Sequence, residues 1–85
     1  MLSVKTSKDF DRDLRKQKLT AELLEVLSCL YRGEPLPTKY KDHALHGDKK
    51  GWRDCHVQND LVLIYKIEDD ILYLARLNTH SEVFG

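Results

Sequence analysis

The chain has 85 residues, 41% of them hydrophobic and 33% charged, and 14 basic and 14 acidic side chains give a formal net charge of zero. This length suits a single domain, 1–85, and excludes a second core. No apolar run approaches the roughly 20 residues that a membrane span requires, and no signal peptide is visible. We therefore expect a cytoplasmic protein without a membrane partner, whose two cysteines are free thiols.

A net charge of zero argues against a protein that holds nucleic acid by bulk electrostatics alone. The charges are unevenly distributed, however. Residues 1–18 contain six Lys/Arg and three Asp, and residues 38–53 contain five Lys/Arg and two Asp. Residues 61–85 contain two Lys/Arg and four acidic residues. The sequence is therefore compatible with a locally basic surface on a neutral molecule.

The first half of the chain predicts a strand and two helices. An apolar strand over 2–4 is followed by Thr6-x-x-Asp9, which resembles a capping box opening a helix over 8–18. Thr20 is the expected N-cap of a second helix. The apolar side chains of that second helix recur at helical spacing and are Leu23, Val26, Leu27, Leu30 and Tyr31.

The second half predicts an antiparallel meander after a long loop. Residues 34–51 show no period of either kind, and a loop of this length is usually functional. The sequence pattern predicts strands over 52–57, 61–67 and 71–77, joined by short turns that favour antiparallel pairing. We expect the second helix to pack on one face of this sheet, which leaves the other face for a functional site and for the tail, 78–85.

Titratable side chains are concentrated between residues 39 and 60, where three of the four histidines lie. Strand alternation places Trp52, Asp54 and His56 on one face. Histidine exchanges protons near neutral pH. With His80 near the C-terminus, these residues suggest acid/base chemistry on an anionic substrate, and the alternative is that the histidines lie on the surface or contact a partner.

Other chemistry fits this stretch less well. His43-x-x-His46 and His56-x-x-x-Asp60 would suit one metal ion on helices, but they fall on a loop and at a strand end, so no metal site is predicted. Cys55 points away from His56 on the strand, so we expect a buried thiol rather than a nucleophile.

Aromatic and basic side chains in the same region are open to two interpretations. Tyr40, Trp52 and Phe84 are either stacking platforms for bases or, for the first two, parts of the core. Five cations either contact phosphate or line a solvated loop. They are Lys39, Lys41, Lys49, Lys50 and Arg53.

Several separate motifs follow one another in the second half of the chain. They are Tyr40-Lys41-Asp42-His43-x-Leu45-x-Gly47, Gly51-Trp52-Arg53-Asp54-x-His56-Val57, Asp60 before Leu63-Ile64-Tyr65-Lys66, Arg76, Thr79-His80-Ser81 and Phe84-Gly85. Together they resemble the YafQ branch of the RelE/ParE superfamily of bacterial type II toxins. The first half matches this family only in its strand-helix-helix order.

The resemblance implies an α+β, RelE-like fold, β-α-α-β-β-β, with two helices packed on a mainly antiparallel four-stranded sheet. It also implies a ribosome-dependent mRNA endonuclease, or mRNA interferase, that needs no cofactor. Its partners would be the ribosome, mRNA and a cognate antitoxin of the DinJ/RelB type, which inhibits the toxin. Operator DNA would be bound only through that antitoxin.

Matched position by position, the catalytic residues of the family fall on His43, His56, Asp60, His80 and Phe84. His80 is then the general acid/base nearest the scissile phosphate. The expected RNA-binding residues are Lys39, Lys41, Lys49, Lys50, Arg53 and Arg76. Of these, the two arginines are the candidates for stabilising the charge of the phosphorane.

Two other functions remain open on the same fold. A ParE-like topoisomerase poison needs no acid/base set, so the histidines weigh against it. A catalytically inactive toxin-fold module would act only with its antitoxin as an operon repressor. Because the chain is neutral, docking on a ribosome would depend on the basic loop and the first helix.

Overall fold

The computed structural model describes all 85 residues and has ten short elements. In chain order these are β1 (Ser3–Thr6), α1 (Lys8–Arg15), α2 (Ala21–Tyr31), the 3₁₀ helix η1 (Thr38–Tyr40), β2 (His43–Ala44), the 3₁₀ helix η2 (Gly47–Lys49), β3 (Arg53–Gln58), β4 (Leu61–Glu68), β5 (Ile71–Thr79) and α3 (His80–Phe84). The strands form one sheet in the order β1-β5-β4-β3-β2. Only the β1–β5 pair is parallel.

The α+β class and the antiparallel meander of β3, β4 and β5 are confirmed, but the expected four-stranded sheet is wrong by one strand. The additional strand, β2, lies inside the predicted loop and pairs with β3. Two residues are too few to show an alternating pattern in the sequence. The strand exists only through its hydrogen-bonded pairing with β3. The chain also ends in a third helix, α3, where the sequence left open a tail or a short helix.

The predicted cap of the first helix is also corrected. Ser7, not Thr6, is the N-cap of α1, and its Oγ accepts a hydrogen bond from the Phe10 N–H at 2.9 Å. The helix ends at Arg15, three residues before the predicted end. The prediction for α2 is confirmed, since the Thr20 side chain accepts from the Leu23 N–H at 3.2 Å.

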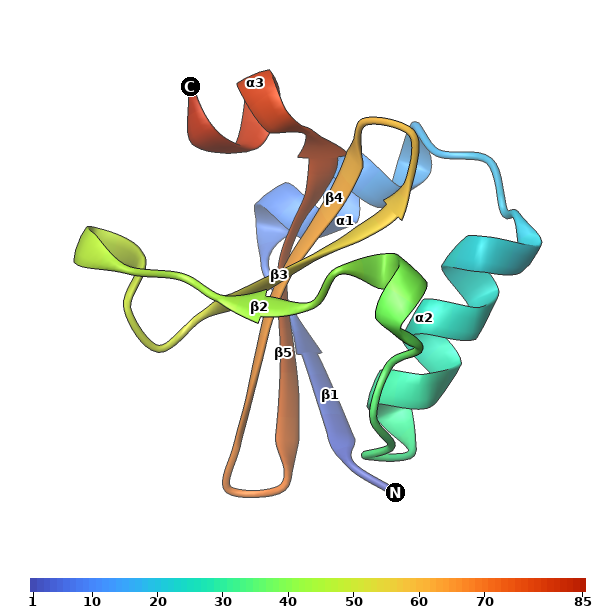
Figure 1. Ribbon diagram of the computed structural model, residues 1–85, viewed down its shortest axis with the longest axis vertical. Helices are drawn as coiled ribbons and strands as arrows, with labels where there is room; N and C mark the ends of the chain where they lie inside the picture. The colour runs from blue at the N-terminus through green and yellow to red at the C-terminus, as the bar shows by residue number, and fades with distance from the viewer.

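Helices α1 and α2 share one hydrophobic core with the sheet (Figure 1). The helices contribute Phe10, Leu23, Val26 and Leu30, of which the last three follow the predicted spacing. Tyr31 departs from that prediction and is exposed. Each fully buried side chain of this kind stabilises the fold by about 1.5–3 kcal/mol. No helix has the length and apolar character needed to cross a membrane.

The opposite face of the sheet, here called the open face, carries the predicted site. Cys55 and Val57 belong to the core, so strand alternation turns Asp54 and His56 to the open face. In Figure 1, the segment between β2 and β3 and the helix α3 both project from the sheet on the side away from α2. These two segments border the open face.

A bulge in β5 controls which side chains border the open face near α3. Ile64 pairs with Arg76 and Tyr65 pairs with Leu74, so Ala75 is the extra residue. Leu74 stays in the core after this shift. Ala75 and Arg76 together line a cavity next to α3. The bulge therefore places a cation beside the site without removing a core leucine.

Candidate active site

Three histidines and a phenylalanine form a row on the open face. The ring centroids of His43 and His56 are 6.4 Å apart, those of His56 and His80 are 4.9 Å apart, and those of His80 and Phe84 are 5.8 Å apart. The four side chains come from β2, β3 and α3. The structure thus brings together four of the five predicted catalytic residues, which lie far apart in the sequence.

Strand register explains why these residues meet. His43 of β2 pairs with Asp54 of β3, two residues before His56. Leu61 pairs with Thr79, so the turn between β3 and β4 lies beside the start of α3. The fifth predicted residue, Asp60, occupies that turn and completes the group.

Asp60 orients His80. Its Oδ1 lies 2.9 Å from His80 Nδ1 and also accepts a hydrogen bond from the His80 backbone N–H at 3.3 Å. The hydrogen bond from the His80 side chain lowers the pKa of Asp60 below its usual value, so the group is a carboxylate at neutral pH. A carboxylate accepts from Nδ1–H, and this leaves Nε2 of His80 available to a substrate.

Asp54 lies in the site although it was not among the predicted catalytic residues. It is buried, and its Oδ1 has no hydrogen-bond partner. That oxygen lies 3.3 Å from His43 Nδ1, which is itself 2.9 Å from the Lys41 carbonyl oxygen. Strand alternation had placed Asp54 beside His56, and this signal was sufficient to find it.

Asp54, His56 and His80 have the donor atoms for a metal ion. One ligand atom from each lies within 4.8 Å of the others. A carboxylate and two imidazoles suit zinc or copper, and the unpartnered oxygen of Asp54 is available for such an ion. This set differs from the two pairs considered from sequence spacing. It combines Asp54 and His56, which lie on one face of β3, with His80 of α3, which is distant in the sequence.

Predicted RNA-binding cations lie around two cavities. Lys39 and Lys41 line a cavity of about 330 Å³ together with His56. Lys49 and Arg76 line another of about 220 Å³, and Lys49 Nζ is 6.0 Å from the centroid of the Phe84 ring. Four of the six predicted cations therefore line cavities that border the histidine row, and one of them, Lys39, is also 3.6 Å from Glu25 Oε1.

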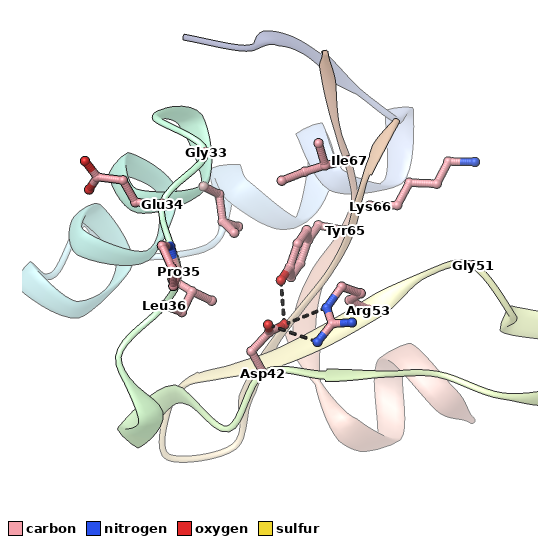
Figure 2. A pocket seen from close by; sticks show the side chains of 11 residues that line it. Gly33, Glu34, Pro35, Leu36, Asp42, Gly51, Arg53, Tyr65, Lys66 and Ile67 are labelled. Atoms are coloured by element: carbon pink, nitrogen blue, oxygen red, sulfur yellow. Dashed lines mark hydrogen bonds and ion pairs between the residues drawn. The ribbon is translucent and has the colours of Figure 1, made fainter. Parts of the chain in front are cut away.

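Arg53 lies on the other face of the sheet. Figure 2 shows its guanidinium and the Tyr65 hydroxyl directed at Asp42, in a cavity formed with the end of α2. Arg53 Nε and Nη2 donate to Asp42 at 3.2 and 3.1 Å, and these hydrogen bonds raise the pKa of Arg53. The structure therefore does not bring Arg53 to the histidine row, and Lys50 is exposed at the end of η2.

Arg76 is held in place by a residue that the sequence did not point out. Asp13 of α1 accepts from Arg76 Nε at 2.8 Å, and it is 2% exposed. Arg76 Nη1 also contacts the carbonyl oxygen of Glu82 in α3 at 3.4 Å. The sequence signal was weak: Asp13 follows Phe10 by three residues, which places it on the buried face of α1.

Burial decides the open interpretation of Tyr40 and confirms the prediction for Cys55. Tyr40 belongs to the core, and its hydroxyl donates to Glu25, which raises the pKa of Tyr40 to about 12. Cys55 is buried and free, and burial raises the pKa of its thiol to about 12. It is therefore a protonated core side chain and not a nucleophile.

Residues 2–85 match the family model described as bacterial toxin of type II toxin-antitoxin system, YafQ. The chain belongs to the YafQ family of type II toxins. This confirms the resemblance read from the second half of the sequence and extends it over the first half. Members of this family are toxins of type II toxin-antitoxin systems, and the matched residues include the whole histidine row.

Relatives of known name and structure agree with this assignment. The mRNA interferase toxin YafQ of Escherichia coli K12 is 43% identical over 82 residues, covering 96% of this chain and 84% of that protein. A copper-bound mutant toxin from Helicobacter pylori superimposes with a TM-score of 0.92 at 40% identity, covering 99% of this chain and 100% of that chain. The toxin of the E. coli DinJ-YafQ complex gives 0.86 at 36% identity, with both chains fully covered.

Proposed function

We propose that this YafQ-family toxin is a ribosome-dependent mRNA endonuclease that acts in the cytoplasm by histidine acid/base chemistry. The observation that carries the proposal is the contact between His56 and His80, whose rings are 4.9 Å apart, with Asp60 bonded to His80. Two proton-transfer groups side by side are what metal-free RNA cleavage requires. The mRNA interferase name of the E. coli relative supports the same activity.

In the proposed reaction, one histidine removes the proton of the ribose 2′-hydroxyl, which attacks the adjacent phosphorus. The other protonates the 5′-oxygen that leaves, so the P–O5′ bond breaks as the new P–O2′ bond forms. His80 acts next to the scissile phosphate because Asp60 fixes its ring. Arg76, held by Asp13, and Lys49 stabilise the negative charge that develops on the phosphorane.

A cognate antitoxin of the DinJ/RelB type would inhibit the toxin, and the E. coli DinJ-YafQ complex supports this partner. Operator DNA would be reached only through the antitoxin. The ribosome would supply most of the affinity for mRNA, since the formal net charge of the chain is zero.

A metal ion has a different role in this proposal. Asp54, His56 and His80 would hold zinc or copper, and the copper-bound relative from H. pylori supports such binding. An ion bound there would supply Lewis acidity, but it would also occupy the ring nitrogens that move protons. We therefore propose that a bound ion inhibits the toxin and takes no part in turnover.

Cleavage of a defined mRNA in a cell-free translation system tests the nuclease proposal. Cut sites are mapped by primer extension, with translating ribosomes present or absent, for wild type, His80→Ala and the matched control His46→Ala. His46 precedes η2 and lies outside the histidine row. We expect cuts only with ribosomes, loss of the cuts in His80→Ala, and wild-type cleavage by His46→Ala.

Other outcomes would identify the alternative functions. An intact message accompanied by topoisomerase-dependent DNA breaks would favour a ParE-like poison. An intact message and no DNA damage, with operator binding in the presence of antitoxin, would favour an inactive repressor module. Cleavage by His80→Ala at the wild-type rate would remove His80 from the proposed mechanism.

A further inference from the structure

The open face carries a second group of aromatic and basic side chains beyond the histidine row. We propose that this group forms a groove for single-stranded RNA, here called the RNA groove, which leads from Phe84 across the sheet toward β1. The inference rests on the proposed function, because the RNA in the groove is the strand that the histidines cleave. From the sequence, Lys49 and Arg76 were expected to contact phosphate and Trp52 was one candidate for stacking on bases; the other residues of the groove come from the structure alone.

The RNA groove consists of two cavities of about 220 and 280 Å³ that share Trp52 and Ala75. The first is bordered by η2 on one side and by Val83 of α3 on the other. The second reaches Lys5 and Thr6 of β1. Because the two cavities have two lining residues in common, they adjoin one another along the open face.

The first cavity begins where the candidate active site ends. Val83, in its wall, is the neighbour of Phe84, whose ring is 5.8 Å from that of His80. Lys49 lines the same cavity and lies 6.0 Å from the Phe84 ring. A strand whose scissile phosphate lies at His80 would therefore place its neighbouring nucleotide in the first cavity.

Two aromatic rings make the groove suitable for bases. Trp52 lines both cavities and Tyr73 lines the second, and both side chains are only half buried. Lys66 Nζ lies 4.6 Å from the Trp52 ring centroid and 5.2 Å from that of Tyr73. Unpaired bases stack on rings of this kind while nearby cations contact the phosphates.

The charge of the groove is complementary to a polyanion. Four cations line it or stand over its rings, against one carboxylate in its wall; one of the cations, Arg76, is also paired with Asp13 behind the wall, which leaves three cations without a carboxylate partner. The cations are Lys5, Lys49, Lys66 and Arg76, and the carboxylate is Asp48. This local excess of positive charge belongs to a chain with a formal net charge of zero. Stacking rings beside cations favour single strands over duplex RNA, whose bases are already stacked.

The single tryptophan of the chain makes the proposal directly testable. An oligoribonucleotide carrying 2′-O-methyl groups throughout has no nucleophile and stays intact during a titration. We expect it to quench the emission of Trp52 in a saturable manner. Affinity should increase from a trinucleotide to a decanucleotide, because the longer strand occupies the active site and both cavities.

Variants separate stacking from general electrostatics. Tyr73→Leu should weaken binding by about 5- to 150-fold, the range for loss of one base–aromatic stack, and Tyr73→Phe should restore it. Lys66→Gln should weaken binding and reduce its salt dependence. Tyr31→Leu and Lys18→Gln are matched controls that change an aromatic and a cation outside the groove, and both should bind as wild type. Thermal unfolding monitored by circular dichroism verifies that each variant is folded.

Several results would overturn the RNA groove. They are the absence of quenching at saturating RNA, wild-type binding by Tyr73→Leu and Lys66→Gln, and equal quenching by duplex RNA or polyglutamate. The nuclease proposal fails separately, in the translation assay. Quenching without cleavage would support the RNA groove and refute the nuclease proposal. Cleavage without quenching would support the nuclease proposal and refute the RNA groove.

Discussion

The carboxylate of Asp13 lies 2.8 Å from Nε of Arg76 and joins the first helix to the last strand across 63 positions of sequence. The same carboxylate accepts the backbone N–H of Leu77 at 2.9 Å and the side-chain amide of Asn78 at 3.1 Å. β1 pairs with β5 only as far as Leu74, so the edge of β5 beyond Leu74 has no neighbouring strand. There the Asp13 carboxylate accepts the backbone N–H of Leu77 in place of a strand. One buried side chain thereby completes a sheet edge and fixes a cation beside the candidate active site.

Loss of this carboxylate should destabilise the fold. Asp13→Ala leaves the guanidinium of Arg76 and the N–H of Leu77 without their partner, and we expect the free energy of unfolding to fall by about 2–3 kcal/mol. Urea denaturation at neutral pH measures the change. Asp11→Ala, on the exposed side of the same helix, should change it by less than about 0.5 kcal/mol. Equal effects of the two variants would contradict the structural role of Asp13.

The same group should make stability depend on pH in the acid range. Burial opposes the ionisation of Asp13, but hydrogen bonds from Arg76, Leu77 and Asn78 outweigh it and lower the pKa of Asp13. The stabilisation is therefore complete above the unfolded-state pKa of about 3.9 and is lost as the pH falls through the lower folded-state value. Urea midpoints between neutral pH and about pH 3 should decline less steeply for Asp13→Asn than for wild type. Parallel curves would show that Asp13 does not contribute.

Asp60 should act on cleavage through His80. Asp60→Asn removes the acceptor that fixes the His80 tautomer, and we expect the cleavage rate with translating ribosomes to fall by about 10²-fold. The pH profile of the residual activity should change as well, because it reports the proton-transfer groups of the site, and Asp60 no longer fixes which ring nitrogen of His80 carries the proton. Asp69→Asn, at the turn between β4 and β5, is a matched control that should leave both rate and profile unchanged. A lower rate with an unshifted profile would indicate a structural role only.

Zinc should inhibit the toxin. If Asp54, His56 and His80 hold the ion, titration with Zn²⁺ should shift the ring signals of both histidines in NMR spectra and abolish cleavage in parallel. A chelator selective for zinc and copper over magnesium, which spares the ribosome, should leave the activity of untreated toxin unchanged. Loss of activity on chelation would instead make the ion part of the catalytic machinery. His46→Ala should not alter zinc binding, since His46 is not part of this set.

Local patterns in the sequence were sufficient for several parts of the structure. Thr20 capped the second helix as predicted, and Leu23, Val26 and Leu30 form the buried face that their spacing indicated. Strand alternation placed His56 opposite Cys55, and Cys55 is buried in the core. These features depend on the geometry of neighbouring residues, which repeats every 3.6 positions in a helix and every two in a strand.

The same alternation carried information that the predicted site did not use. Arg53 lies two positions from Cys55, so it belongs to the core side of β3, and the structure pairs it there with Asp42. Its assignment to RNA binding followed from its place among the cations of residues 38–53 and not from the strand pattern. Asp54 was placed on the histidine face by that pattern, and the structure brings it to His43.

The sequence by itself determined the types of the longer elements, their boundaries to within three residues, the family and the residues capable of proton transfer. The tertiary structure alone decided that His43 enters a fifth strand, that a bulge at Ala75 brings Arg76 to α3, and that Asp13 holds this arginine. Each of these depends on strand register or on contact between distant segments. Such pairings leave no periodic trace in the chain, because their free energy comes from partners that only the folded sheet brings together.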